Sequence, residues 1–257
     1  MSSRRLKQFI YGLIYLLIFG GIVFGIYFLF LKPAPSCFDN VQNEGEQGVD
    51  CGGPCTKICI PSSTQPMAVV GSVYAFSALP GHVALLADVA NPNSDFAAET
   101  FQYTFNFYDA SGNVVQSVPG SSFIYADETK YLAVPNEAVS GPFDHVGMTI
   151  GTVHWVPAAQ FGSVPQLTFN NVMTGASAVT SGTTAVSGEV TDADSASFQN
   201  IEIVAVLKAP GGIPAGVTET ELDAIAPNQA KNFSVMYPTS SANIDPAATQ
   251  VYAYVAR

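Results

Sequence analysis

The sequence has little positive charge. Its 257 residues include nine Lys and Arg against twenty Asp and Glu, which gives a formal net charge of −11. Beyond Pro33 the basic residues are Lys57, Lys130, Lys208, Lys231 and Arg257. Nucleic-acid binding needs a basic surface, so nucleic acid is excluded as a partner, and attraction of this part to an anionic membrane surface is excluded for the same reason. An acidic composition of this kind is typical of a protein with a soluble surface.

Residues that carry reactions are also scarce. The three histidines, His82, His145 and His154, show no metal-ligand spacing, and the sequence contains neither a Gly-x-Ser-x-Gly elbow nor a phosphate-cradling glycine loop. The paired acids are Asp127 with Glu128, Asp192 with Asp194, and Glu219 with Glu221. The surrounding sequence predicts that these acids lie in turns or on the solvent-exposed faces of strands. We therefore assign no catalytic, cofactor-binding or metal-binding residue and predict a protein that is not an enzyme.

The 24 residues from Gln8 to Leu31 carry no charge and are mostly apolar. At about 1.5 Å of rise per residue this stretch reaches roughly 36 Å as a helix, enough to cross a hydrocarbon core of about 30 Å. Basic residues precede this stretch and acidic residues follow Lys32, and Lys and Arg beside a first span stay in the cytoplasm. We predict a cytoplasmic tail over 1–8, a transmembrane helix over 9–31 and an extracytoplasmic remainder.

Two other readings of this segment stay open. The apolar part of a cleaved signal peptide is normally about 7–15 residues and precedes a small-residue cleavage site, whereas this run is longer and ends in Lys-Pro-Ala-Pro. A lipid-modified Cys37 would need a large aliphatic residue in the preceding positions, which hold Ala, Pro and Ser. Within the span, Gly21 and Gly25 form a small-xxx-small pair, a candidate for close helix packing, although glycine is common in spanning helices.

All four cysteines fall in one short window, at Cys37, Cys51, Cys55 and Cys59. On the oxidising side of a membrane this pattern predicts two disulfides, with three pairings open. A zinc site is the alternative, but the paired Cys-x-x-Cys knuckles of tetrathiolate sites are absent.

Calcium is a further alternative for this window. The side chains that offer oxygen atoms are Asp39, Asn43, Glu44, Glu46 and Asp50. Val41 and Glu44 occupy positions where a helix-loop-helix calcium loop needs an oxygen ligand and a glycine. Calcium binding is therefore the weaker reading and stays open.

The same window resembles a short cysteine motif of exported microbial surface proteins, Cys-x-Asp-x-x-x-Asn-x-x-Glu-x-Gly-Val-Asp-Cys-Gly-Gly-x-Cys. The matching residues are Cys37, Asp39, Asn43, Gly48, Val49, Asp50, Cys51, Gly52, Gly53 and Cys55, with Glu46 displaced by one position. The resemblance implies an extracytoplasmic setting and a structural role beside an anchor or between modules. It carries no catalytic assignment.

Beyond a linker at 61–66 the pattern is that of β-strands. Phe101, Tyr103, Phe105 and Phe107 alternate with polar residues, which indicates a half-buried strand. The following Tyr-Asp-Ala-Ser-Gly-Asn run predicts a turn, and a hairpin continues at Val114. The aromatic stripe is interpreted as core.

The same unit returns about 101 residues later. Leu86–Asn91 matches Ser187–Asp192, the aromatic stripe matches Ile201, Ile203, Ala205 and Leu207, and Thr129–Val134 matches Ala230–Val235. We predict a mainly β protein: a Cys-rich disulfide segment over 36–60, the linker over 61–66, then two tandem immunoglobulin-like antiparallel β-sandwiches over 67–160 and 167–257, joined by a linker at 161–166.

The segment Phe105-Asn-Phe107-Tyr108-Asp109 resembles the signature of the FxLYD domain, an exported β-sandwich module, with Phe107 in place of the usual leucine. The second copy keeps Leu207 and a Gly-Gly turn but departs from the signature elsewhere. The resemblance implies immunoglobulin-like sandwiches of about seven strands and no established enzymatic activity.

These features favour a single-pass cell-membrane protein whose sandwiches act as a spacer, adhesion or assembly module, with a protein or another cell-surface component as partner. Two alternatives stay open. One is an extracytoplasmic glycan- or peptide-binding, or hydrolytic, module, which would need a cleft with converging acids and aromatic residues. The other is a subunit of an envelope complex that contacts partners through the spanning helix.

Overall fold

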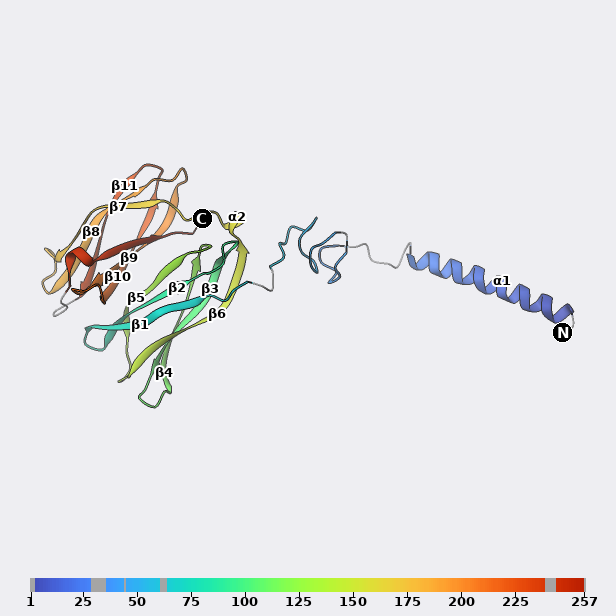
Figure 1. The fold of residues 1–257 in the computed structure, drawn as a ribbon, viewed down its shortest axis with the longest axis horizontal. Helices are drawn as coiled ribbons and strands as arrows, with labels where there is room; N and C mark the ends of the chain where they lie inside the picture. The colour runs from blue at the N-terminus through green and yellow to red at the C-terminus, as the bar shows by residue number, and fades with distance from the viewer. Residues whose placement is uncertain (1–2, 29–35, 44, 61–63, 239–243, 257) are drawn as a thin grey trace. The chain divides into compact units, whose positions relative to one another are not determined.

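A computed structural model describes residues 3–28, 36–43, 45–60, 64–238 and 244–256 (Figure 1). The chain divides into two compact units, Met1–Cys59 and Ile60–Arg257. The first unit contains the apolar helix and the Cys-rich segment, and the second contains all the named strands.

Helix α1 spans Ser3–Ile26. Within it, Lys7–Ile26 is long and apolar enough to cross a membrane, a test that the apolar part of a signal sequence also passes. Gly21 and Gly25 lie in α1, and a Cβ atom at either position would meet nothing within 4 Å. Helix pairing through these glycines stays a prediction, and residues 29–31 of the predicted span lie outside the described residues.

The second unit is built from strands, with bounds as follows: β1 (Ala68–Leu79), β2 (His82–Ala90), β3 (Phe96–Tyr108), β4 (Val114–Ile124), β5 (Thr129–Ala138), β6 (His145–Pro157), β7 (Leu167–Ala176), β8 (Thr183–Asp192), β9 (Phe198–Lys208), β10 (Pro214–Ile225), β11 (Ala230–Pro238) and β12 (Gln250–Tyr254). Two short helical turns accompany them, α2 (Ala158–Phe161) and the 3-10 turn η2 (Pro246–Ala248).

These strands form four antiparallel sheets of three strands each. Sheet β1-β2-β5 packs on β4-β3-β6, and sheet β7-β8-β11 packs on β10-β9-β12 with the same connectivity. The prediction of a mainly β protein with two sandwiches is confirmed. The resemblance implies about seven strands per sandwich, and the described residues contain six named strands in each, with one strand on either side of a central strand in every sheet.

The two cores lie where the alternating pattern places them. Phe101, Phe105 and Phe107 are fully buried on β3, and Tyr103 packs beside them. The single tryptophan, Trp155, packs against the same core. In the second sandwich, the core side of β9 is lined by Ile201, Ile203, Ala205 and Leu207, each no more than 1% exposed. Burying aromatic and branched side chains on facing sheets is the main source of stability in such folds.

The predicted hairpin joins β3 to β4. The Asp109 carboxylate accepts hydrogen bonds from the backbone N–H groups of Ser111 and Asn113, 2.9 and 2.8 Å long, and Gly112 takes a positive φ of 80°. An Asp side chain that caps its own turn in this way stabilises the reversal.

The second copy makes the same turn without the aspartate. Backbone bonds from Ala209 N to Ile213 O and from Gly212 N to Ala209 O repeat those of the first hairpin. Gly211 and Gly212 both take positive φ angles, 95° and 81°. Two glycines therefore provide here what a carboxylate and one glycine provide in the first copy.

Candidate functional site: the interface between the two sandwiches

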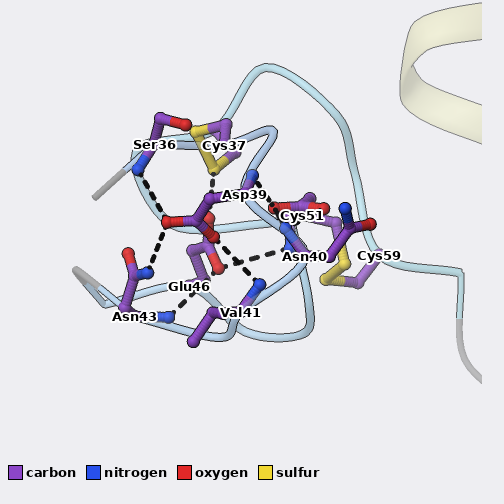
Figure 2. Close-up of a disulfide and its surroundings, with 11 residues drawn as sticks. Ser36, Cys37, Asp39, Asn40, Val41, Asn43, Glu46, Cys51 and Cys59 are labelled. Carbon is purple, nitrogen blue, oxygen red and sulfur yellow. Dashed lines mark hydrogen bonds between the residues drawn. A yellow bond between two sulfur atoms is a disulfide. The ribbon is translucent and has the colours of Figure 1, made fainter. Parts of the chain in front are cut away.

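The four cysteines form two disulfides, Cys37–Cys55 and Cys51–Cys59 (Figure 2). The disulfide prediction is confirmed, and a pairing that the spacing left open is now assigned. Because every cysteine is bonded to another, none offers the thiolate that a zinc site needs.

The acids of this segment are used as hydrogen-bond acceptors for the backbone. The Asp50 carboxylate accepts the N–H groups of Asp39 and Asn40, at 3.0 and 3.1 Å. The Glu46 side chain, only 7% exposed, accepts the N–H groups of Asn43 and Asp50 (Figure 2). These carboxylates replace secondary structure in a segment too small for a core.

One group of potential ligand atoms does converge here. An oxygen of Glu46 and the sulfur atoms of Cys37 and Cys55 lie within 4.8 Å of one another. Both sulfurs belong to one disulfide, which is a poor metal ligand, and the other Glu46 oxygen already accepts backbone hydrogen bonds. The arrangement fits a structural knot.

In the second unit, strands β2 and β9 are buried on both faces. Val83, Leu85 and Ala87 of β2 face the first core, whereas Ala84 and Leu86 pack with the residues of the second sandwich. The outer faces of sheets β1-β2-β5 and β10-β9-β12 therefore cover each other.

On β9 the residues that alternate with the core set form the facing surface. Val204 and Val206 are fully buried, and the register places Val204 opposite Glu219 of β10 and Tyr252 of β12. Glu202 lies opposite Tyr254. This surface combines aliphatic and aromatic side chains with the carboxyl groups of Glu202 and Glu219.

The equivalent positions on the other two sheets are polar. Where β9 has Val204 and Val206, the outer face of β3 has Thr104 and Asn106, and where β2 has Leu86, β8 has Ser187. The apolar outer faces occur on the two sheets that meet. Polar outer faces of this kind suit contact with water.

Tyrosines bridge the two sandwiches. The rings of Tyr131 and Tyr252 have centroids 4.7 Å apart. The backbone N–H of Tyr131 donates to the hydroxyl of Tyr254 at 2.9 Å, and the Tyr125 hydroxyl donates to the carbonyl of Val255 at 2.9 Å. Buried tyrosines need such partners, and these partners lie in the opposite sandwich.

A fully buried lysine lies in this interface. Lys130, in β5, is 0% exposed, and its Nζ lies 3.4 Å from Oε2 of Glu202 in the second sandwich. The same Nζ lies 3.8 Å from the ring centroid of Phe123 and 4.6 Å from that of Tyr254. Among the described residues its contacts are this ion pair and two aromatic faces, with no hydrogen bond.

Burial shapes the titration of the groups around Lys130. It lowers the pKa of the Lys130 ammonium, against the opposing effect of Glu202 and Glu128. Burial, followed by the charge of Glu202, raises the pKa of Glu219 to about 7. Burial also raises the pKa of Glu128. One cation thus faces several carboxyl groups that are poorly solvated.

A second titrating group lies further along the same interface. Burial raises the pKa of Asp88 on β2 to about 6, while Lys208 of β9 and a hydrogen bond with Tyr131 act in the opposite direction. Asp88 lies opposite Tyr131 on the neighbouring strand of the first sandwich, and Lys208 belongs to the second sandwich. The interface therefore carries charged groups on both of its surfaces.

Two acids, Glu219 and Asp192, contradict the sequence interpretation of the acid pairs. Glu219 faces the first sandwich instead of solvent, and Asp192 is 0% exposed, with Oδ1 accepting the N–H of Asp194. The signal for the interface was present in β9, whose run Ile-Val-Ala-Val-Leu has no polar alternation. Such continuous apolar strands are typical of burial on both faces.

The other candidate side chains lie apart from one another. His82 contacts the Pro80 carbonyl, His145 pairs with Asp144, and His154 with Glu99. Four surface hollows of about 220, 530, 540 and 470 Å³ occur in the described part of the second unit. None of these four is lined by two carboxylates, the feature that a hydrolytic cleft would need.

No family model matches the sequence, and no curated protein matches it. One of the solved structures with a similar arrangement is a crystal structure of red sea bream transglutaminase, at 13% sequence identity and a TM-score of 0.23. The match covers 76% of this chain and 31% of that one, so the chain spans about a third of that enzyme's length. A likeness at this level carries no argument about activity.

Proposed function

We propose that this chain is a single-pass membrane protein of the cell surface whose two sandwiches act together as one non-enzymatic spacer or assembly module. The N-terminal tail is cytoplasmic, α1 spans the membrane, and the disulfide-bonded segment and both sandwiches lie outside. The sandwiches are FxLYD-like modules.

The observation that carries this proposal is the buried interface between the sandwiches. Two ligand-binding sandwiches connected by a flexible linker would expose their outer faces to water, and those faces would be polar. Here the apolar faces of β2 and β9 cover each other, and residues of both sandwiches form one hydrophobic cluster. Such packing suits a module that holds its length and orientation under load.

The anchor and its orientation rest on the apolar helix and the disulfides. A helix long enough to span the membrane precedes two disulfides, which persist on the oxidising side of a membrane. A cleaved signal sequence would give the same disulfides but no retained helix. Mass spectrometry of the protein from membranes separates the two cases, because only retention yields peptides from 8–31.

Crosslinking of the full-length protein in intact cells, with mass-spectrometric identification of the linked residues, tests the assembly role. We expect links from loops of the sandwiches to a specific neighbour. Links confined to α1, and lost when Gly21 and Gly25 are both replaced by leucine, would instead support the envelope-complex alternative. Recovery of the chain without any neighbour would contradict an assembly role and leave a spacer.

A further inference from the structure

We propose that Lys130 and Glu202 form an amide bond between Nζ and Cδ, which joins β5 of the first sandwich covalently to β9 of the second. Three observations converge on this pair. The lysine is 0% exposed, its Nζ lies 3.4 Å from a Glu202 carboxylate oxygen, and the two residues belong to different sandwiches.

The surroundings of Lys130 favour the neutral amine over the ammonium ion. Phe123 and Tyr254 present ring faces to Nζ, at 3.8 and 4.6 Å, and no hydrogen bond from a described residue solvates it. Burial penalises the charge of the Lys130 ammonium and so favours loss of its proton, which the proposed step passes to the Glu202 oxygen that lies 3.4 Å away. Transfer to Glu202 creates a free amine beside a carboxylic acid, the two reactants of amide formation.

Further carboxyl groups surround the pair. Glu219 interacts electrostatically with both Glu202 and Lys130, and Glu128 interacts with Lys130. Burial raises the pKa of Glu219 to about 7 and also raises that of Glu128. A protonated carboxyl beside a reacting carbonyl can donate to the oxygen that leaves, and its carboxylate can then take the proton from nitrogen.

The step balances without a co-reactant. The Nζ lone pair attacks Cδ of the protonated Glu202, and the C–N bond forms. The C–O bond to the hydroxyl breaks, and the hydroxyl takes a proton from Glu219 and leaves as water. Glu219 recovers a proton from the former amine. The ammonium and carboxylate of the starting ion pair become one neutral amide and one water, so the net charge of the protein does not change.

The fixed geometry favours amide formation here, whereas free amines and carboxylic acids in water do not condense. Folding holds the two groups in contact, which replaces a bimolecular encounter by an intramolecular one, and the surrounding rings limit access of water to the product. The Glu202 side chain is 33% exposed, so the released water has a route to solvent. Neither sandwich contains a cysteine, so this amide would be the covalent cross-link between them in addition to the backbone.

Intact-mass analysis of the purified full-length protein tests the proposal. We expect a species lighter than the sequence mass, after correction for the two disulfides, by the mass of one water. Trypsin digestion should release a branched peptide that contains Lys130 and Glu202, identified by fragmentation. A full sequence mass in folded, aged protein would overturn the proposal, and so would a water loss that maps to any other pair.

Variants distinguish the two residues that form the bond from the residue that assists its formation. Lys130→Arg and Glu202→Ala should each restore the full mass. Glu219→Gln should lower the fraction bonded at a fixed time severalfold, whereas Glu221→Gln, its exposed neighbour two positions along β10, should leave it unchanged. Wild-type rates in Glu219→Gln would remove Glu219 as the proton donor. Because the readout is the wild-type mass, a variant that does not fold leaves the test intact.

Discussion

Asn91 closes one end of the first sandwich with hydrogen bonds that a smaller residue cannot replace. Its side-chain amide donates to the carbonyls of Phe96 and Tyr125, both at 2.8 Å, and its oxygen accepts the N–H of Asn93 at 3.1 Å. The residue is 2% exposed. Because Asn91→Ala removes these hydrogen bonds from a buried site, we expect the free energy of unfolding to fall by about 2–4 kcal/mol, measured by denaturant unfolding.

Asn113→Ala is the matched control. Its side chain bonds the Asp109 carboxylate in an exposed turn, so water can replace the lost bond. We expect a change within about 0.5 kcal/mol. Equal losses in the two variants would contradict the role given to burial at Asn91.

Glu219 makes stability depend on pH. Its pKa is raised from 4.5 to about 7 in the folded protein, so the folded state binds a proton more tightly than the unfolded state does. This stability is fully present below about pH 4.5 and is lost as pH rises through about 7. Asp88, raised from 3.8 to about 6, acts in the same direction. The Tm should therefore be a few degrees lower at about pH 8 than at about pH 5.

Replacement of the titrating group should flatten this dependence. Glu219→Gln is uncharged at every pH, so its Tm should fall less than that of the wild type between the two pH values. Glu221→Gln removes an exposed carboxyl from the same strand and should keep the wild-type slope. A wild-type slope in Glu219→Gln would show that burial of Glu219 does not control it.

At the scale of the element, β2 holds the two sandwiches together because both of its faces are apolar. Leu86 is 1% exposed and packs in the cluster of the second sandwich, whereas the neighbouring Leu85 faces the first core. Leu86→Arg places an unpaired charge in the interface, at a cost of about 3–5 kcal/mol. We expect the sandwiches to separate, seen as a larger radius of gyration in X-ray scattering and as two thermal transitions.

Val115→Arg controls for the added charge, since Val115 is 50% exposed on β4. It should leave both the radius of gyration and the single transition unchanged. If the proposed amide is present, Leu86→Arg should be compared in the Glu202→Ala background, because a covalent tie would limit separation. An unchanged radius there would contradict the interface.

At the scale of the whole molecule, the disulfides stabilise the first unit alone. Both connect residues within 37–59, and no cysteine occurs in the second unit. Loss of the disulfides of a small domain typically costs about 2–5 kcal/mol. Reductant should therefore make the 36–59 segment sensitive to protease while the melting curve of the sandwiches does not change, as followed by limited proteolysis and thermal scanning. A shift of that curve would show that the units depend on each other.

Much of the fold is legible from local pattern. Alternation along Phe101–Phe107 predicts a strand with one buried face, and the repeat at Ile201–Leu207 predicts a second copy, because a strand displays successive residues on opposite faces. The strand number was less predictable. Short edge strands have weak patterns, so the expected number of about seven came from the resemblance alone, and six strands are named in the described part of each sandwich.

By itself, the sequence determined the apolar helix, the clustering of the cysteines and the duplicated β-pattern, since each depends on residues close together in the chain. Tertiary structure alone decided which cysteines pair, that the outer faces of β2 and β9 meet, and that Lys130 and Glu202 lie in contact. The reason is physical. Local pattern assigns a side chain to one face of a strand, but only the packing of distant segments decides whether that face meets water or another sheet, and that choice sets the pKa and the chemistry of every charged group on it.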